Sequence, residues 1–418
     1  MADKVLSYEE RLKWFHEARF GMFIHWGLYA VHGRGEWVMF VERWRADDYA
    51  KTAWKFNPKK FDANKWAAIA KDAGMKYMVL TTRHHDGFCL FDSKVSDFTA
   101  AKTGAGRDLV AEYVKACREA GLKVGFYYSL LDWRFPGYFE PKKYPESAKK
   151  MVEQYHAQVR ELMTNYGKID ILWYDGGWIA HDPNSNVAEF WRSAEVNKMV
   201  RELQPHIIIN NRSGIEEDLD TPEQHVTASK PGRGWESCMT IGDSCGWGYV
   251  HNNPNMKTVT LLLQNLTIAA AGEGNYLLNC GPRPDGQIRR EEQVRLHAMG
   301  EWLRVNGEAI YGSQRCSLSG GMLGVWTRKG NTAYFCIHRY PGTGEAIVPL
   351  VKTRAVSASI LATGDKVTIR QEYNGRLVLG GLPKKPVDPH ITVLKVEFES
   401  VPESITETDK AAWLSGSV

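Results

Sequence analysis

The sequence predicts an α/β protein that consists of a (β/α)8-like barrel of the TIM type, regular or irregular, and a C-terminal antiparallel β-sandwich. The first observation is a unit of amphipathic helix, stop residue and apolar strand, which recurs up to about residue 310. The second is that polar residues gather where those strands end. The third is a change after about residue 312 to short alternating strands with Gly-Asn turns. We therefore expect a barrel over residues 1–312, a sandwich over 313–400 and a loose tail over 401–418.

Four helix-and-strand units follow one another in the first part. In the first unit, residues 64–73 have the periodicity of an amphipathic helix and residues 77–82 form an apolar strand. Glycine stops the helix in three units and proline in the fourth, as is typical of helix C-termini. These stop residues are Gly74, Gly121, Gly167 and Pro205.

Further strands are predicted on both sides of these units. RFGMFIHWG (19–27) supplies a first strand, and GNYLLNCGP (274–282) a last one, followed by a helix over 291–307. With weaker candidates in 225–241, the count reaches seven or eight strands, which favours a barrel over an open doubly wound sheet. No GxGxxG opens the first unit, which weakens the dinucleotide-binding alternative.

Charge and composition limit the classes of partner. A net charge of +4 over 418 residues leaves no basic stripe and argues against a nucleic-acid partner. No apolar run approaches the roughly 20 residues that span a bilayer, so no membrane partner is expected. Fifteen Trp residues suit sugar rings but also a large core. The sequence does not fix the oligomeric state, so a homo-oligomer stays open.

Cysteine usage and the N-terminus indicate the compartment. The seven Cys residues are irregularly spaced and form no CxxC pair, which is typical of reduced thiols in a cytoplasm. The N-terminal stretch MADKVLSYEERLKWF is charged and has no apolar core, so no signal peptide is predicted. A cytoplasmic protein is expected; removal of a leader would instead imply a secreted or periplasmic one.

Five strand ends carry polar and aromatic residues that suit chemistry. In a barrel of this type the C-terminal ends of the strands form one rim, where active sites lie. The residues at these ends are His25 and Trp26, Arg83 to Asp86, Tyr127 to Ser129, Trp173 to Asp175, and Asn210 to Arg212. Random placement of polar residues would not favour this one end of the barrel.

Asp175 is the central candidate because it ends the apolar strand ILWYD. Alternate side chains of a strand share a face, so Trp173 and Asp175 point the same way and Tyr174 points to the other side. We place Trp173 and Asp175 inside the barrel, because a carboxylate under the helices would be desolvated without use. There it could meet a reacting atom beside an aromatic wall.

Several of these residues also have simpler explanations. Asp175 could cap a helix, and Arg212 could be an ordinary ion-pair partner. His84 and His85 could be structural imidazoles, or they could bind zinc together with His25. Residues in three other segments could be purely structural: Glu36 and Trp37 in GEWV, Glu223 in TPEQ, and Glu236 in WESC.

From about Tyr8 to Glu308, the chain resembles the family-29 glycoside hydrolases, the retaining α-L-fucosidases. The resemblance rests on several motifs that occur in the family's order and at suitable spacing. They are FGMFIHWGLYAV, GEWV, AGMKYMVLTTRHHDGF, RDLV, GFYYS, DW, LWYDGGW and WGY. A C-terminal β-sandwich is also expected from this resemblance.

The resemblance assigns roles to individual residues. Asp175 matches the nucleophile. Glu223 and Glu236 both match the acid/base residue. We prefer Glu223, which lies in a polar loop eleven residues after Arg212, whereas Glu236 begins a hydrophobic run. The residues that match the fucose-binding set are His25, Glu36, Trp37, His84, His85, Tyr127, Trp173 and Arg212. The histidines would then bind sugar hydroxyls, with no metal and no cofactor.

The implied function is that of a retaining exo-α-L-fucosidase. It would remove terminal fucose from a fucosylated oligosaccharide or glycoconjugate by double displacement. Two alternatives stay open: a metal-dependent barrel hydrolase that uses His25, His84 and His85, and a non-catalytic fucose-binding protein. Linkage preference depends on loops whose shape the sequence does not give.

Overall fold

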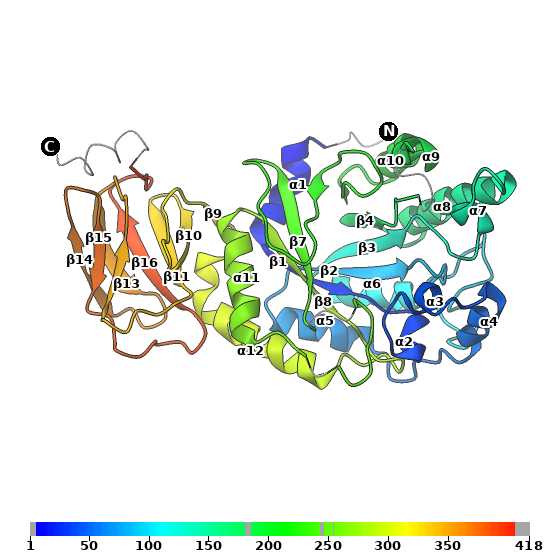
Figure 1. Ribbon diagram of the computed structural model, residues 1–418, viewed down its shortest axis with the longest axis horizontal. Coiled ribbons are helices and arrows are strands. Elements are labelled where there is room, and N and C mark those ends of the chain that lie inside the picture. Colours follow the sequence, from blue (N-terminus) through cyan, green and yellow to red (C-terminus); the bar gives the residue numbers. More distant parts are fainter. Residues whose placement is uncertain (1–5, 180–184, 243–245, 254, 406–418) are drawn as a thin grey trace.

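The computed structural model describes residues 6–179, 185–242, 246–253 and 255–405. Figure 1 shows two bodies side by side, a strand-and-helix body that contains the N-terminal part and a β body that contains the C-terminal part. The predicted fold class is confirmed: a nearly closed parallel barrel is followed by a curled antiparallel sheet.

Eight parallel strands form the barrel in the order β5-β4-β3-β2-β1-β8-β7-β6. A bridge from Asn210 to Leu219 joins the two outermost strands, so the ring is nearly closed. The strands are β1 (Phe20–Ile24), β2 (Tyr77–Arg83), β3 (Lys123–Ser129), β4 (Ile171–Asp175), β5 (Ile208–Ile209), β6 (Leu219–Asp220), β7 (Gly234–Thr240) and β8 (Asn275–Cys280).

Helices surround this ring unevenly. Helix α1 (Tyr8–Ala18) precedes β1, and no helix stands between β5 and β6 or between β6 and β7 within the described residues. The barrel is therefore irregular on this side. The remaining helical elements are α2 (Tyr29–His32), α3 (Val38–Val41), α4 (Ala46–Ala50), η1 (Lys51–Trp54), α5 (Ala63–Asp72), α6 (Leu109–Glu119), α7 (Pro136–Phe139), α8 (Pro145–Asn165), α9 (Val187–Phe190), α10 (Ser193–Leu203), α11 (Val259–Ala271), α12 (Arg290–Asn306) and η2 (Gly307–Ala309).

The ends of helix α5 show why the predicted units form. Asp62 caps its N-terminus by accepting from the backbone N–H groups of Asn64 and Lys65, which would otherwise lack a partner. Past its C-terminus, Gly74 has φ +85°, a left-handed conformation that glycine adopts without steric cost. The chain then turns directly into β2.

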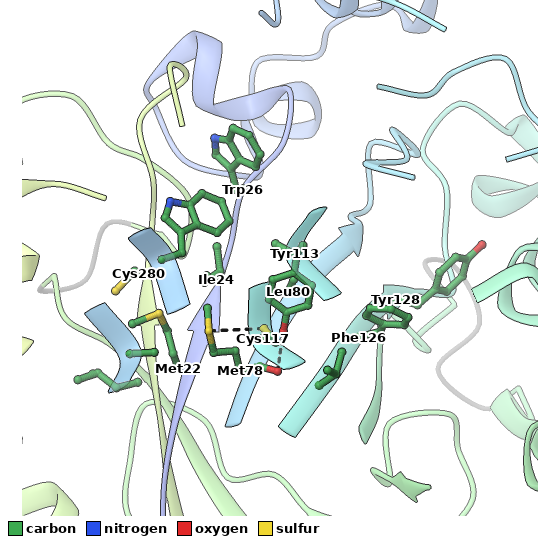
Figure 2. Packing of buried hydrophobic residues seen from close by; sticks show 14 of the residues in the cluster. Met22, Ile24, Trp26, Met78, Leu80, Tyr113, Cys117, Phe126, Tyr128 and Cys280 are labelled. Carbon is green, nitrogen blue, oxygen red and sulfur yellow. Dashed lines mark hydrogen bonds between the residues drawn. The ribbon is translucent and has the colours of Figure 1, made fainter. Parts of the chain in front are cut away.

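The two faces of the barrel strands bury different cores. Outward side chains such as Met22, Leu80 and Phe126 lie in one buried cluster with Tyr113 and Cys117 of α6 (Figure 2). Inward side chains such as Phe23 and Trp173 fill the barrel interior. The period-2 alternation predicted for LWYD is confirmed, since Tyr174 belongs to the outer cluster and Trp173 to the inner one.

The C-terminal body is an antiparallel sheet in the order β12-β15-β14-β13-β16-β11-β10-β9. It encloses its own apolar core, which includes Trp326, Phe335 and Leu394. The strands are β9 (Gln314–Arg315), β10 (Gly324–Lys329), β11 (Thr332–Ile337), β12 (Glu345–Val348), β13 (Ala355–Ile360), β14 (Lys366–Gln371), β15 (Leu377–Gly380) and β16 (Thr392–Phe398).

Helices α11 and α12 lie between the barrel and this sheet (Figure 1). Trp302 on α12 donates its indole N–H to the carbonyl of Ile391 at 2.9 Å. Ile391 and Val393 belong to the barrel's apolar cluster, so the two bodies share buried surface. The sheet thus supports the barrel from the side of α11 and α12.

The predicted tail begins as part of the sheet. Ser404 pairs with Val351 and donates its hydroxyl to the carbonyl of Ser317 at 2.7 Å, so residues 401–405 pack against the β body. Residues 406–418, which include the segment predicted to be loose, lie outside the described residues.

Two further features concern the cysteines and the length of the helices. The six cysteines in the described part of the chain are free; Cys245 lies outside it. None of the helices in the described ranges has the length and apolar character needed to cross a bilayer.

Candidate active site

Asp175 ends β4 at the rim of the barrel and is held there by its neighbours. Asn210 bonds both backbone groups of Tyr174, with its side-chain oxygen 2.8 Å from the N–H and its NH2 group 2.9 Å from the carbonyl. The carbonyl of Asp175 accepts from the N–H of Leu130 at 2.8 Å. These bonds fix the last residues of the strand, and therefore the direction of the carboxylate.

Both oxygens of this carboxylate accept hydrogen bonds. Tyr127 donates to Oδ2 at 2.8 Å, and Arg212 Nη1 donates to Oδ1 at 3.0 Å. Burial alone would raise the pKa of Asp175, but Arg212, His85 and the Tyr127 hydroxyl outweigh burial and lower it. Asp175 is thus an oriented, ionised carboxylate. It is bonded by side chains from the barrel and caps no helix in the described structure.

Arg212 joins Asp175 to a second carboxylate. Its Nη2 donates to Glu223 Oε2 at 2.8 Å, while the guanidinium lies 4.7 Å over the ring of Trp173. Side-chain exposure rises from 13% at Asp175 to 21% at Arg212 and 40% at Glu223. The three groups therefore run from the barrel interior towards solvent, with Glu223 at the outer end.

Glu236 lies in a different environment. It is fully buried near the start of β7, where its carboxyl accepts from Tyr77 at 2.6 Å and from the indole N–H of Trp173 at 2.9 Å. Burial raises its pKa to about 7. The burial expected from its hydrophobic run is observed. Glu236 supports Trp173 from within the barrel.

The three predicted histidines lie together at the ends of β1 and β2. The His25 and His84 rings are 5.7 Å apart, and those of His84 and His85 are 4.0 Å apart. Burial lowers the pKa of His25 to about 3 and that of His85 to about 4, so both are neutral at physiological pH. Burial also lowers the pKa of His84, whose Nδ1 has no hydrogen-bond partner in the described structure.

Glu36 and Trp37 lie in the segment between α2 and α3. Glu36 Oε2 accepts from the backbone N–H groups of Trp247 at 2.7 Å and Gly248 at 2.8 Å. Burial raises the pKa of Glu36. Trp37 meets the His85 ring edge to face at 5.5 Å, so this segment contributes to the wall beside the histidines.

Trp133 and Trp178 complete this wall; they lie in the motifs DW and LWYDGGW, but neither was named as a binding residue. Their rings meet His85 at 5.3 and 5.4 Å. Trp133 follows β3 and Trp178 follows the Gly-Gly pair after β4, so the strand-end rule would have found both if extended by four residues.

Asn279 escaped the sequence prediction, and Ser129, although it stood among the strand-end residues, was given no role there. Asn279 Oδ1 lies 2.7 Å from His25 Nδ1, and Ser129 Oγ lies 2.7 Å from His85 Nδ1. Asn279 lies within β8, where nothing in the local sequence marks it, and the end position of Ser129 on β3 does not reveal its imidazole partner. Only the barrel geometry brings them to the imidazoles.

The site can supply a carboxylate nucleophile and bind hydroxyl groups. It combines an ionised carboxylate, a second and more exposed carboxylate on the same guanidinium, and neutral imidazoles. In the described part of the chain, no group of three or more His, Cys, Asp or Glu side chains is arranged to hold a metal ion. The zinc arrangement considered for His25, His84 and His85 is therefore not found there.

Comparison with known proteins points to one class of enzyme. Residues 3–308 match the family model described as α-L-fucosidase. The tissue α-L-fucosidase of Mus musculus is 33% identical, over 92% of this chain and 90% of that protein.

Solved structures agree with this match. The α-L-fucosidase isoenzyme 1 of Paenibacillus thiaminolyticus superposes with a TM-score of 0.86 at 37% identity, over 94% of this chain and 100% of that one. A family-29 α-L-fucosidase from Bacteroides thetaiotaomicron, solved as a trapped covalent intermediate, has a TM-score of 0.86 at 30% identity, over 95% of this chain and 97% of that one.

Proposed function

Because the chain belongs to the α-L-fucosidase family, we propose that it removes terminal α-L-fucose from glycans with retention of configuration and that Asp175 is its nucleophile. The covalent intermediate of the Bacteroides thetaiotaomicron enzyme supports a two-step reaction in the family. The substrate class is a fucosylated oligosaccharide or glycoconjugate. The observation that carries the assignment is the chain of contacts from Tyr127 through Asp175 and Arg212 to Glu223.

Asp175 has the properties that a nucleophile needs. It is ionised because Arg212 and the Tyr127 hydroxyl stabilise its negative charge. In the first step, one carboxylate oxygen bonds to the anomeric carbon as the bond from that carbon to the leaving oxygen breaks. In the second step, water attacks the same carbon and Asp175 is released as carboxylate.

Glu223 is the acid/base residue in this proposal. It gives its proton to the leaving oxygen in the first step and takes a proton from the attacking water in the second. Its partial exposure supports the assignment, because the leaving group must depart towards solvent, and its contact with Arg212 holds it on the same guanidinium as Asp175. Glu236 is the less favoured alternative, since both its oxygens are bonded inside the barrel.

The remaining residues bind the sugar in this proposal. The neutral rings of His25, His84 and His85 contact the hydroxyls, and Arg212 and Tyr127 hold the nucleophile. Trp37 and Trp173 supply apolar walls, and Glu36 binds a hydroxyl beside Trp37. The apolar C6 methyl of fucose accounts for only ~1–3 kcal/mol of discrimination, so the hydroxyl contacts decide specificity.

Two substitutions test the nucleophile. We expect Asp175→Ala to lose nearly all turnover of an aryl fucoside and to recover it with azide, which enters the vacated space and yields a fucosyl azide. Asp220→Ala is a matched control, because Asp220 also binds an arginine, Arg233, at 2.8 Å, and its other side-chain partners, Asn211 and Ser229, are not proposed site residues. Wild-type-like rates in Asp175→Ala would refute the assignment.

The roles of the two glutamates can be distinguished by varying the leaving group of the substrate. Glu223→Ala and Glu236→Ala are compared on an aryl fucoside with a good leaving group and on a natural glycan with a poor one. The acid is needed mainly for the poor leaving group, so we expect Glu223→Ala to lose far more activity on the glycan. The same selective loss in Glu236→Ala would transfer the role to Glu236.

The proposal also covers the cellular location, the oligomeric state and the domain boundary. We keep a cytoplasmic location as a prediction, to be tested by cell fractionation, and a homo-oligomer as an open state, to be tested by light scattering. We also propose a domain boundary near residue 312, where η2 has ended and β9 has not begun. Limited proteolysis should cut there before it cuts within either body.

A further inference from the structure

We propose that Ser129 is a positioning residue that keeps the proton of neutral His85 on Nδ1, so that Nε2 accepts a hydrogen bond from the substrate hydroxyl next to the anomeric carbon. The inference rests on the proposed fucosidase function for the identity of that hydroxyl. The protonation pattern itself follows from protein contacts alone.

The tautomer follows from a count of hydrogen bonds around Ser129. Its hydroxyl oxygen lies 2.7 Å from His85 Nδ1 and 3.0 Å from the carbonyl oxygen of Leu131. A serine hydroxyl has one proton to donate. If that proton goes to Leu131, His85 Nδ1–H can donate to Ser129, and both contacts are hydrogen bonds. If it goes to His85, the oxygens of Ser129 and Leu131 face each other without a proton between them.

The ring of His85 is also fixed in orientation. The ring is buried, and three tryptophans, Trp37, Trp133 and Trp178, meet it edge to face with ring centroids 5.3–5.5 Å away. Gly176 also borders the ring, since an added Cβ there would lie 3.1 Å from His85 Cε1. Close packing on these sides means that the ring cannot turn to exchange its two nitrogens without displacing its neighbours.

The second nitrogen of His85 then faces the nucleophile as an acceptor. Nε2 lies 3.7 Å from Asp175 Oδ2, which is longer than a hydrogen bond and is a contact between two acceptors. A hydroxyl that enters beside both atoms relieves this contact by donating to Nε2. The hydroxyl on C2 is adjacent to the carbon that bonds to Asp175, so it is the one that reaches this position.

This arrangement leaves the nucleophile available. Tyr127 already donates to Asp175 Oδ2, and a second donor from His85 would occupy a lone pair needed for attack. Loss of the Ser129 hydroxyl would allow the proton to move to Nε2, from where it would point at Asp175. Ser129 therefore acts through His85 on both the substrate and the nucleophile.

Nitrogen NMR tests the tautomer directly. In protein labelled with 15N-histidine, we expect His85 to show the pattern of a neutral imidazole protonated on Nδ1, with the resonance assigned by its loss in His85→Gln. An Nε2–H tautomer in the free wild-type protein would overturn the proposal. Because this readout needs no catalysis, it is independent of the proposed activity and of whether any Ser129 variant folds.

Kinetics tests the consequence for the substrate. We expect Ser129→Ala to lower kcat/KM for an aryl α-L-fucoside roughly tenfold, the scale of one hydrogen bond, and to have no effect on the matching 2-deoxyfucoside. Ser129→Thr, which keeps the hydroxyl, should restore most of the loss. Ser237→Ala is the matched control, since Ser237 is equally buried but bonds the carbonyl of His225 at 2.8 Å.

Two outcomes separate the inference from the function on which it rests. An equal loss on both substrates in Ser129→Ala would mean a merely structural role and would overturn the inference. A wild-type enzyme that hydrolyses neither substrate would instead contradict the proposed function and leave the NMR result standing.

Discussion

Replacement of Arg212 by glutamine should shift the acid limb of the pH profile of kcat/KM to higher pH. Arg212 binds Asp175 at 3.0 Å and Glu223 at 2.8 Å, so it stabilises the ionised form of the nucleophile. Its removal raises the pKa of Asp175, and a higher pH is then needed to ionise this group in the free enzyme. The acid limb of kcat/KM reports that ionisation.

The size of the shift follows from the contact distance. At 3.0 Å and an effective dielectric constant of about 20, the attraction between Arg212 and Asp175 is roughly 5 kcal/mol. The side chain of Arg212 is 21% exposed to solvent, and Glu223 binds the same guanidinium. Because both effects weaken the attraction, we expect about a quarter to a half of this energy to act on the pKa of Asp175. That corresponds to an upward shift of about 1–2 pH units.

The assay is the pH dependence of kcat/KM for fucosyl fluoride, whose leaving group needs little help from an acid. We also expect kcat/KM at the optimum to fall by roughly 10²–10³-fold, as for the loss of one preorganised donor at a reacting group. Arg233→Gln is the control, since Arg233 binds Asp220 at 2.8 Å with a similar side-chain exposure of 17%. An unmoved acid limb in Arg212→Gln, or an equal shift in the control, would refute the reasoning.

Three further substitutions probe the same site. Tyr127→Phe removes the donor to Asp175 Oδ2, so we expect about tenfold lower kcat/KM and a small upward shift of the acid limb, measured as above; an unchanged profile would contradict a role in holding the nucleophile. Gly176→Ala places a Cβ at φ +68° and 2.9 Å from Leu131, so calorimetry should show a destabilisation of about 1–3 kcal/mol, and unaltered stability would contradict the crowding. The wild type should lose stability as pH rises from about 4.5 to about 7, and Glu236→Gln should not show this loss. In this window the folded carboxyl keeps its proton while the unfolded one releases it, at a cost of up to about 3 kcal/mol, and urea unfolding at several pH values measures the difference.

The sequence predicted the regular parts of the fold because helix ends and strand periodicity are local. Gly121 and Gly167, which were predicted to end helices, have φ +71° and +68°, the left-handed conformation typical of a glycine at a helix C-terminus. Strand β6 was not predicted because it has only two residues and owes its place to pairing with β7. A strand this short carries no periodic pattern.

The candidate site was predicted where a residue ends a strand and not where it only supports another side chain. Asp175 and Arg212 follow strands, and the structure brings them to 3.0 Å. The position of Glu223 on the same guanidinium follows from the bridge between Glu223 and Cys238, a long-range pairing that local sequence does not specify. Ser129 ends β3 and stood among the strand-end residues, but its contact with His85, which follows β2, joins two strands and is contained in no linear pattern.

The most direct test of the central claim is to trap the glycosyl-enzyme. Wild-type protein is treated with an activated 2-deoxy-2-fluoro-fucoside, which forms the covalent intermediate faster than it is hydrolysed, and is then digested and sequenced by mass spectrometry. We expect one added 2-fluorofucosyl group on the peptide that contains Asp175. A label on another carboxylate, or no label together with an inverted product in the NMR spectrum of released fucose, would contradict the account.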